Sequence, residues 1–299
     1  MEKFSFSSAL MHFQNTKGPG SFVWKWLLTA FIAMTLLFGG SMFMTFDMMA
    51  GFGITAPGQT VPVSNEEAFA FIGRMFGTMA ILVPLTVVVM AVLEASALRR
   101  YIRNEAFSIR FGKDELRVIG VYLWWALMVL VAMIIMMILG LIIGMFVMII
   151  AAGLPMAAPF LALIFNLATY LGLLALAVRF APASAVTIRD NKVTFFEAEA
   201  ATKGRFWPLF GAFLIPIVAY YVLSLVLQLL LLMPVMTSIA TQNDASFTPT
   251  LFVMMGVSTV ISGNAFAFMM LVNLGITSRA AITDESWSGR GGEVVETFE

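Results

Sequence analysis

The sequence lacks cysteine altogether and holds one histidine, His12, which precedes the first apolar run. The missing thiols exclude disulfides, thiolate metal sites and cysteine nucleophiles. A single histidine outside the apolar runs excludes a histidine-based metal cage or catalytic triad within them. No P-loop, H-E-x-x-H, G-x-S-x-G or dinucleotide-binding pattern is present either. We therefore expect no cofactor and no enzymatic activity.

Charged residues are scarce as well. Only 11% of the 299 residues are charged, whereas 61% are hydrophobic and the mean hydropathy is +0.95. Soluble domains carry about a quarter charged residues, so this chain cannot cover a water-facing surface, and its main solvent must be lipid. Lys+Arg and Asp+Glu both number 17, a balance that gives no indication of a nucleic-acid partner. The expected partners are membrane lipids, a membrane protein or a second copy of the chain.

Long uncharged runs predict the fold. About 20 apolar residues cross the hydrocarbon core, and the runs predict six spans at about 26–46, 70–97, 118–151, 156–179, 207–236 and 250–278. The first run exceeds a signal-peptide core of about 7–15 residues, so we expect a retained span. The prediction is an all-α integral membrane protein, a six-transmembrane-helix bundle with short cytoplasmic interfacial helices. It forms one domain over residues 1–283, followed by an acidic disordered tail over 284–299.

Capping patterns predict several helix boundaries. Ser64 and Glu67 form an S-x-x-E capping box that starts a helix on the outer side. Thr194 and Glu197 form a second box, which predicts a short cytoplasmic helix. The other expected boundaries are an N-cap at Asp114, a turn at 153–155, a helix end at Gly204 and a helix start at Thr248 and Pro249.

The basic residues predict the orientation. If the N-terminus is cytoplasmic, every Lys and Arg except Arg74 falls on the cytoplasmic side, sixteen of the seventeen. The positive-inside rule then places both termini in the cytoplasm. The outer connections are short and carry few charges, so function is expected in the bundle or on its cytoplasmic face.

Aromatic residues accompany the basic residues of the cytoplasmic segments. Phe107, Ile109 and Phe111 alternate with polar residues, and the N-terminal segment offers Phe4, Phe6, Leu10 and Phe13. Two interpretations stay open: segments that lie in the lipid headgroup layer, or loops that pack on the bundle. The residues expected to contact lipid headgroups are Arg99, Arg100, Arg103, Lys203 and Arg205.

A few polar residues interrupt the spans. Asn166, Tyr221 and Asn264 form a candidate mid-membrane polar layer, near which lie Tyr220, Gln228, Ser258 and Ser262. Intramembrane polar residues indicate a substrate path by default. Neutral amides also join helices through hydrogen bonds of about 0.6–2 kcal/mol, and we favour this structural interpretation.

Glu94 is the candidate titratable group. A proton-coupled transporter needs a carboxyl group that changes protonation within the membrane, and Glu94 lies near the cytoplasmic end of the second span. Arg99 and Arg100 follow soon after it. We therefore favour an ion pair with a snorkelling arginine over a proton relay.

An internal repeat of three two-helix units is a further hypothesis. A basic residue beside an aromatic or apolar one opens each odd-numbered span, at spacings of about 90 residues. The triplets Ala95-Ser96-Ala97 and Ala183-Ser184-Ala185 close the second and fourth spans. Topology alone would generate much of this pattern.

The stretch from Arg179-Phe-Ala-Pro-Ala to Thr202-Lys-Gly-Arg-Phe-Trp-Pro-Leu-Phe-Gly211 resembles a known type of domain. It is similar to the membrane domain associated with bacterial glycerophosphoryl diester phosphodiesterases and related uncharacterised inner-membrane families. The likeness is weaker over Glu94–Trp125, and the phosphodiesterase catalytic domain is absent from this sequence. The resemblance implies a six-helix architecture in a bacterial inner membrane, and it does not carry an activity across to this chain.

The sequence thus predicts a non-enzymatic bacterial inner-membrane protein of an accessory or lipid- and envelope-organising type. The alternative is a small-molecule or lipid transporter with a mid-membrane polar path.

Overall fold

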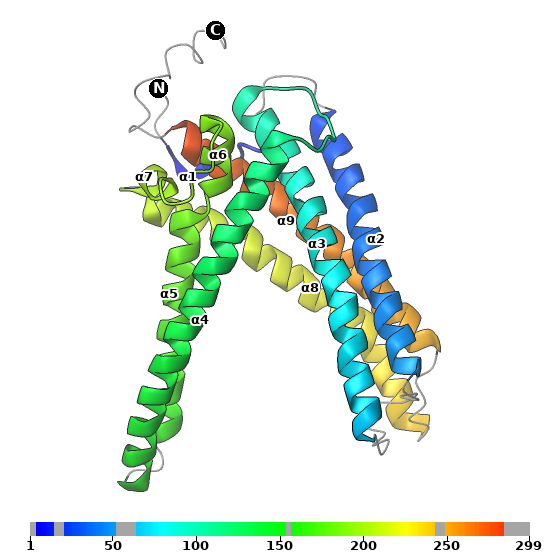
Figure 1. Cartoon of the computed structure of the whole chain (residues 1–299). Coiled ribbons are helices and arrows are strands. Elements are labelled where there is room, and N and C mark those ends of the chain that lie inside the picture. Colours follow the sequence, from blue (N-terminus) through cyan, green and yellow to red (C-terminus); the bar gives the residue numbers. More distant parts are fainter. Residues whose placement is uncertain (1–3, 15–20, 52–63, 154–156, 243–248, 284–299) are drawn as a thin grey trace. The chain divides into compact units, whose positions relative to one another are not determined.

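The computed structural model describes residues 4–14, 21–51, 64–153, 157–242 and 249–283 (Figure 1). Six helices in this part of the chain are long and apolar enough to cross a membrane, the fourth combining α5 with α6. No strand occurs among the described residues, so the all-α, six-span prediction is confirmed and the protein is a multi-pass membrane protein. The helices are α1 (Phe6–Leu10), α2 (Phe22–Gly51), α3 (Asn65–Arg103), α4 (Lys113–Gly153), α5 (Ala157–Phe180), α6 (Ala183–Asp190), α7 (Ala198–Thr202), α8 (Phe206–Gln242) and α9 (Pro249–Ile282).

The long helices extend beyond the predicted spans at most ends. Helix α3 has 39 residues and α4 has 41, whereas about 20 suffice to cross the hydrocarbon core. Uncharged runs mark only the part of a helix that lies in hydrocarbon, and the polar ends continue the same hydrogen-bonded ladder. The predicted tail over 284–299 lies outside the described residues, as do Thr248 and residues 154 and 155 of the predicted turn.

The chain divides into two compact units, which are described separately. Unit 1 comprises Met1–Ala9, Phe111–Phe213 and Ile276–Glu299, and unit 2 comprises Leu10–Arg110 and Leu214–Gly275. Helices α8 and α9 therefore each contribute residues to both units.

Unit 1 is organised around aromatic rings. Helix α4 packs against α5 and α6, and α5 packs against α7. The buried Phe195 stacks on Phe180 with ring centroids 5.1 Å apart, and it meets the edges of Trp125 and Phe196 at 5.5 and 5.3 Å. The most apolar stretch of α4 contains no buried residue. Because its side chains are apolar and uncovered, this stretch is suited to contact with lipid.

Unit 2 is organised around close helix contacts. Helix α2 packs against α3, and the buried Trp26 donates a hydrogen bond from Nε1 to the Leu93 carbonyl at 2.9 Å. Two glycines of α9 allow close approach: a Cβ at Gly263 would lie 2.7 Å from Cδ2 of Phe38, and one at Gly275 would lie 2.8 Å from the backbone nitrogen of Phe13. Small residues at such contacts are typical of membrane helix packing.

Three of the predicted boundaries are confirmed in the described residues. The Ser64 hydroxyl accepts a hydrogen bond from the Glu67 N–H at 3.3 Å, and the Glu67 carboxylate accepts one from the Ser64 N–H at 2.9 Å. Pro249 is the first residue of α9. Gly204 follows α7 with φ +73, a left-handed conformation that glycine adopts without strain.

The predicted N-cap at Asp114 is wrong. Helix α4 begins one residue earlier, at Lys113, and the Glu115 carboxylate accepts a hydrogen bond from the Gly112 N–H at 2.8 Å. Asp114 instead accepts a bond from Arg117 at 2.8 Å. Both carboxylates lie in the first turn of α4, where the helix dipole favours negative charge.

The capping box predicted at Thr194 is also wrong. Helix α7 begins at Ala198 without a side-chain cap. The Thr194 and Thr187 hydroxyls lie 3.3 Å apart, and the Thr194 N–H donates to the Thr187 hydroxyl at 3.1 Å. These bonds join the loop to α6, so Thr194 serves a tertiary contact rather than a helix start.

The two Ala-Ser-Ala triplets occupy similar local structures. All six residues are buried in helices. Each helix then ends at an asparagine in the left-handed conformation, Asn104 with φ 54 and Asn191 with φ 59. Asparagine tolerates this conformation better than most residues. The similarity agrees with the repeat hypothesis without proving it.

Candidate functional site

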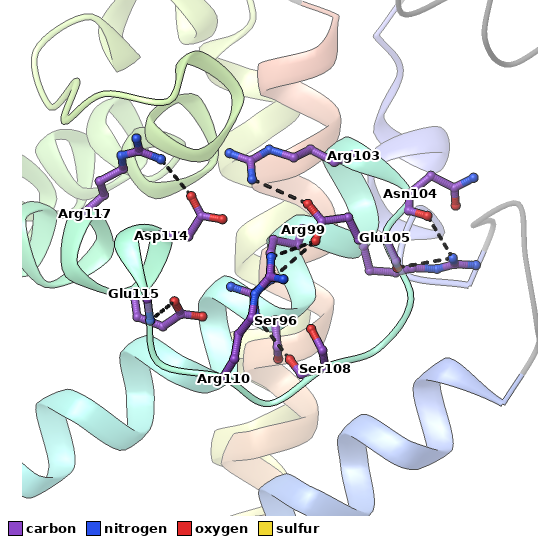
Figure 2. Close-up of polar contacts among 12 residues, drawn as sticks. Ser96, Arg99, Arg103, Asn104, Glu105, Ser108, Arg110, Asp114, Glu115 and Arg117 are labelled. Atoms are coloured by element: carbon purple, nitrogen blue, oxygen red, sulfur yellow. Dashed lines mark hydrogen bonds and ion pairs between the residues drawn. The ribbon is translucent and has the colours of Figure 1, made fainter.

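An arginine cluster at the C-terminal end of α3 is the most charged feature of unit 2. We define it as Arg99, Arg100, Arg103, Arg110 and Glu105. The Glu105 carboxylate lies 2.9 Å from Nη2 of Arg110, 3.5 Å from Nη1 of Arg103 and 4.0 Å from Nε of Arg99. Figure 2 shows these contacts around the single carboxylate. Four arginines and one glutamate leave the cluster a formal charge of +3, which suits it to an anion.

The helix end positions this cluster. Asn104 turns the chain in the left-handed conformation, and the N–H groups of Asn104 and Glu105 donate to the Arg100 and Arg99 carbonyls at 3.1 and 3.4 Å. This hydrogen-bonded turn directs Glu105 back toward the last turn of α3. Cations near a helix C-terminus also complement the helix dipole, so the backbone favours arginines here.

Arg99 and Arg100 are structural members of the cluster. Their side chains are only 1% and 5% exposed. Arg99 donates to the Ser108 carbonyl at 3.1 Å, whereas Arg100 donates to the Glu105 carbonyl at 3.4 Å and lies over the Phe22 ring at 5.9 Å. These bonds hold the non-helical chain after α3. Among the cluster's arginines, Arg110 is exposed and Arg103 is half-buried, so these two remain accessible to a ligand.

Apolar side chains border the exposed arginines. Phe107 packs against Phe22, with ring centroids 6.0 Å apart, whereas Ile109 is 57% exposed. The segment thus directs the Phe107 side chain toward the protein and the Ile109 side chain toward the outside. Phe111, the first residue assigned to unit 1 after this segment, is also exposed. Of the two interpretations of this segment, packing fits Phe107 and exposure to headgroups fits Ile109.

The N-terminal aromatic residues are largely packed. In unit 2, Phe13 is buried against α9, where its ring meets Phe268 edge-on at 5.9 Å. In unit 1, the Phe4 ring lies 5.8 Å from the Arg205 guanidinium, and Phe6 contacts the Gly211 position. Packing on the bundle therefore describes these residues better than a separate interfacial helix.

The two basic residues expected to bind headgroups in unit 1 differ. Lys203 is exposed. Arg205 is half-buried and donates to the Thr283 carbonyl at 2.6 Å, in addition to its contact with Phe4. Lys203 is thus accessible to a headgroup, while Arg205 joins the start of α8 to the end of α9 within unit 1.

The residues of the predicted polar layer belong to two different units. Asn166 is exposed on α5 in unit 1, whereas Tyr221 and Asn264 belong to unit 2. Tyr221 is 66% exposed, and Asn264 donates to the Val260 carbonyl of its own helix at 2.7 Å. Glu94 is half-buried on α3 and has an interaction partner.

A polar pocket of about 240 Å³ lies between α2, α8 and α9 in unit 2. It is lined by Phe38, Tyr220, Gln228, Ser258, Thr259, Ser262, Gly263 and Phe266. Tyr220 and Tyr221 are neighbours on α8, yet only Tyr220 reaches the pocket, because successive helix residues point about 100° apart. The sequence identified most of the polar lining residues, and the structure places Tyr220 rather than the candidate Tyr221 beside them.

The sequence analysis missed Glu105, Arg110 and Glu115 as functional or organising residues. The sequence signals that could have found them were weak. Glu105 directly follows Asn104, and Glu115 lies in the charged first turn of α4. Among the described residues, no group of three or more His, Cys, Asp or Glu side chains could hold a metal ion. Comparison of the chain with protein-family models, curated proteins and solved structures finds no match.

Proposed function

We propose that this is a non-enzymatic bacterial inner-membrane protein that binds anionic lipid and has an accessory or envelope-organising role. The observation that supports it most directly is the net positive arginine cluster, whose half-buried Arg103 and exposed Arg110 accompany the exposed Ile109 at the end of a spanning helix. Guanidinium groups bind phosphate in a bidentate manner. An apolar side chain beside them suits insertion between headgroups.

The proposal includes a cytoplasmic position for both termini and for the arginine cluster. It is supported by the distribution of sixteen of seventeen basic residues and, for the bacterial inner membrane, by the resemblance of residues 179–211. Because the chain has no cysteine, single cysteines test it directly. In intact cells, an impermeant thiol reagent should label Glu66→Cys but not Lys203→Cys. Labelling of Lys203→Cys alone would show that the protein has the opposite orientation in the membrane.

The lipid proposal is tested with an Arg103→Gln/Arg110→Gln double variant. A juxtamembrane basic residue contributes about 1 kcal/mol to attraction by an anionic membrane surface, so removing two should weaken retention of anionic lipid about 30-fold. Native mass spectrometry of the protein from membranes of equal lipid composition measures the bound anionic and zwitterionic lipids. Arg74→Gln, on the opposite side of the membrane, is the matched control. Equal anionic lipid on the double variant and wild type would overturn the proposal.

The second candidate is a small-molecule or lipid transporter, and the polar pocket is the observation that favours it. Every part of a transport path must be accessible to water at some stage of the transport cycle. Cysteines placed at the lining residues Tyr220, Ser258 and Ser262 should then react with water-soluble thiol reagents. Resistance of all three in every condition would remove the basis of a path. A Glu94→Gln variant with unchanged transport would exclude proton coupling through Glu94.

A further inference from the structure

The pocket between α2, α8 and α9 contains hydrogen-bonding groups without protein partners. The Tyr220 hydroxyl, the Gln228 amide and the Ser258 and Ser262 hydroxyls make no hydrogen bond to any described residue. Ser258 is only 6% exposed. Hydrocarbon supplies no hydrogen bonds, so these groups depend on whatever fills the pocket for partners.

A nearby serine strengthens this observation. The Ser224 hydroxyl is buried and has no hydrogen-bond partner. Ser224 lies one turn after Tyr220 and one turn before Gln228, so the three residues share a face of α8. Native proteins leave few buried polar atoms unsatisfied. Ser224 is the buried member of this face, and Tyr220 and Gln228 on either side of it line the pocket, so this face of α8 supports a binding site there.

The lining determines the charge of the ligand. Among the described residues, no Asp, Glu, Lys, Arg or His side chain lines the pocket. A charged ligand would lose its hydration without gaining a counter-ion, which is strongly unfavourable in an apolar environment. The pocket therefore selects an uncharged ligand, unlike the arginine cluster, which suits an anion.

The rings and the volume determine its size and shape. Tyr220 and Phe266 meet edge-on with centroids 6.0 Å apart, and Phe38 supplies a further aromatic wall. Aromatic surfaces accept the C–H faces of a ligand, while the amide and hydroxyl groups bind its polar edges. The 240 Å³ volume is below the ~300–1,000 Å³ typical of sites for drug-sized molecules.

From these features we infer that the pocket binds a small uncharged group with several hydroxyls, such as a polyol or sugar. The group is either a free solute or the neutral hydroxylated headgroup of a lipid. Tyr220, Gln228, Ser258 and Ser262 supply the hydrogen bonds. This inference concerns binding alone, so it stands or falls independently of the anionic-lipid proposal.

The test compares wild type with a Ser258→Ala/Ser262→Ala double variant. Apparent unfolding temperatures of the detergent-purified proteins are measured with millimolar glycerol, myo-inositol and glucose, and with glucose 6-phosphate as the charged counterpart. A site-binding solute at a hundred times its Kd should raise the wild-type value by roughly 5–10 °C, and the double variant should respond little. Ser41→Ala is the matched control, because the Ser41 hydroxyl already donates to the Phe38 carbonyl.

The ligand-free proteins provide an independent readout. Removing unpartnered hydroxyls should leave the double variant at least as stable as wild type. A marked loss would show that the hydroxyls are structural and would overturn the inference. Gly263→Ala offers a second variant, since its Cβ would displace the Phe38 ring that lines the pocket.

A lipid arm separates the two sources of the ligand. Mass spectrometry of lipids that copurify with each protein should show a neutral hydroxylated lipid on wild type and not on the double variant, if the group is a headgroup. Stabilisation by free solutes without such a lipid assigns a soluble ligand. If no uncharged solute stabilises wild type and no such lipid is enriched, or if both proteins respond equally, the inference is wrong.

Discussion

Two segments follow helices that contain a buried Ala-Ser-Ala triplet, and they are held in place by different forces. The arginine segment, Asn104–Arg110, is held by guanidinium groups that donate to its backbone carbonyls. The aromatic segment, Asn191–Arg205, is held by the Phe195 ring within a cluster of aromatic rings. Each begins with a left-handed asparagine. The same backbone turn therefore occurs in two different settings. The first segment presents charge at the surface, whereas the second buries apolar area.

The largest effect is expected in the aromatic segment. Phe195→Ala should destabilise the protein by about 3–5 kcal/mol, because it empties a buried ring position. Phe196→Ala is the matched control, since the Phe196 side chain is exposed. The apparent unfolding temperature in detergent, read by size-exclusion chromatography after heating, measures both. Equal losses in the two variants would contradict an aromatic core centred on Phe195.

Loss of Arg99, the buried residue that holds the arginine segment, should destabilise the protein less than loss of Phe195. Arg99→Met removes the charged donor to the Ser108 carbonyl, and hydrogen bonds to charged groups contribute about 1.5–3 kcal/mol. Limited proteolysis should show faster trypsin cleavage after Arg103 in this variant. Phe195→Leu, which conserves apolar volume in the other segment, should leave that cleavage unchanged. Unchanged cleavage in Arg99→Met would show that Arg99 does not hold the segment.

The left-handed asparagines test the similarity of the two turns. Asn104→Ala and Asn191→Ala should each cost about 1–2 kcal/mol, because alanine is strained in this conformation. Glycine adopts it freely, so Asn104→Gly should be close to neutral. Asn191→Gly should cost slightly more, since the Asn191 amide oxygen also accepts a bond from Arg117 at 3.2 Å. A larger loss in either glycine variant than in its alanine counterpart would exclude backbone strain as the cause.

The smallest effects belong to the exposed ion pairs. Arg110 pairs with Glu105 and Arg179 with Glu199, both at 2.9 Å and with the arginine side chains equally exposed. Exposed pairs contribute about 0–1 kcal/mol. Arg110→Gln and Arg179→Gln should therefore give small and similar losses that vanish at 1 M salt, where charges are screened within about 3 Å. Unfolding temperatures measured in low and high salt check this expectation.

The spans were predictable because hydrocarbon excludes charge, which leaves a signal in the linear sequence alone. Ser64 was predictable for a related reason, since its capping box lies within four consecutive residues. Burial of Arg99 was not predictable, because it requires the chain after α3 to fold back over the helix end. Asp114 and Glu115 are adjacent carboxylates, and only the positions of Gly112 and Arg117 decide which one caps α4.

The polar pocket shows the same limit. The sequence located Tyr220, Gln228, Ser258 and Ser262 within spans, but a span prediction does not fix the rotation of a helix about its axis. Asn264 was expected to bond between helices, but its amide donates to the Val260 carbonyl of its own helix. Which polar residues face each other is therefore a property of tertiary packing.

The close contact between Phe13 and Gly275 has a consequence for biogenesis. Phe13 is synthesised long before Gly275. Gly275, which lies close to the Phe13 backbone, belongs to the last described helix. At about 5–20 residues per second, translation separates the two by roughly 13–50 seconds. Phe13 therefore spends this interval away from its final contact. It completes this contact only after Gly275 of the last described helix has been made, which sets a lower limit on the time needed to assemble unit 2.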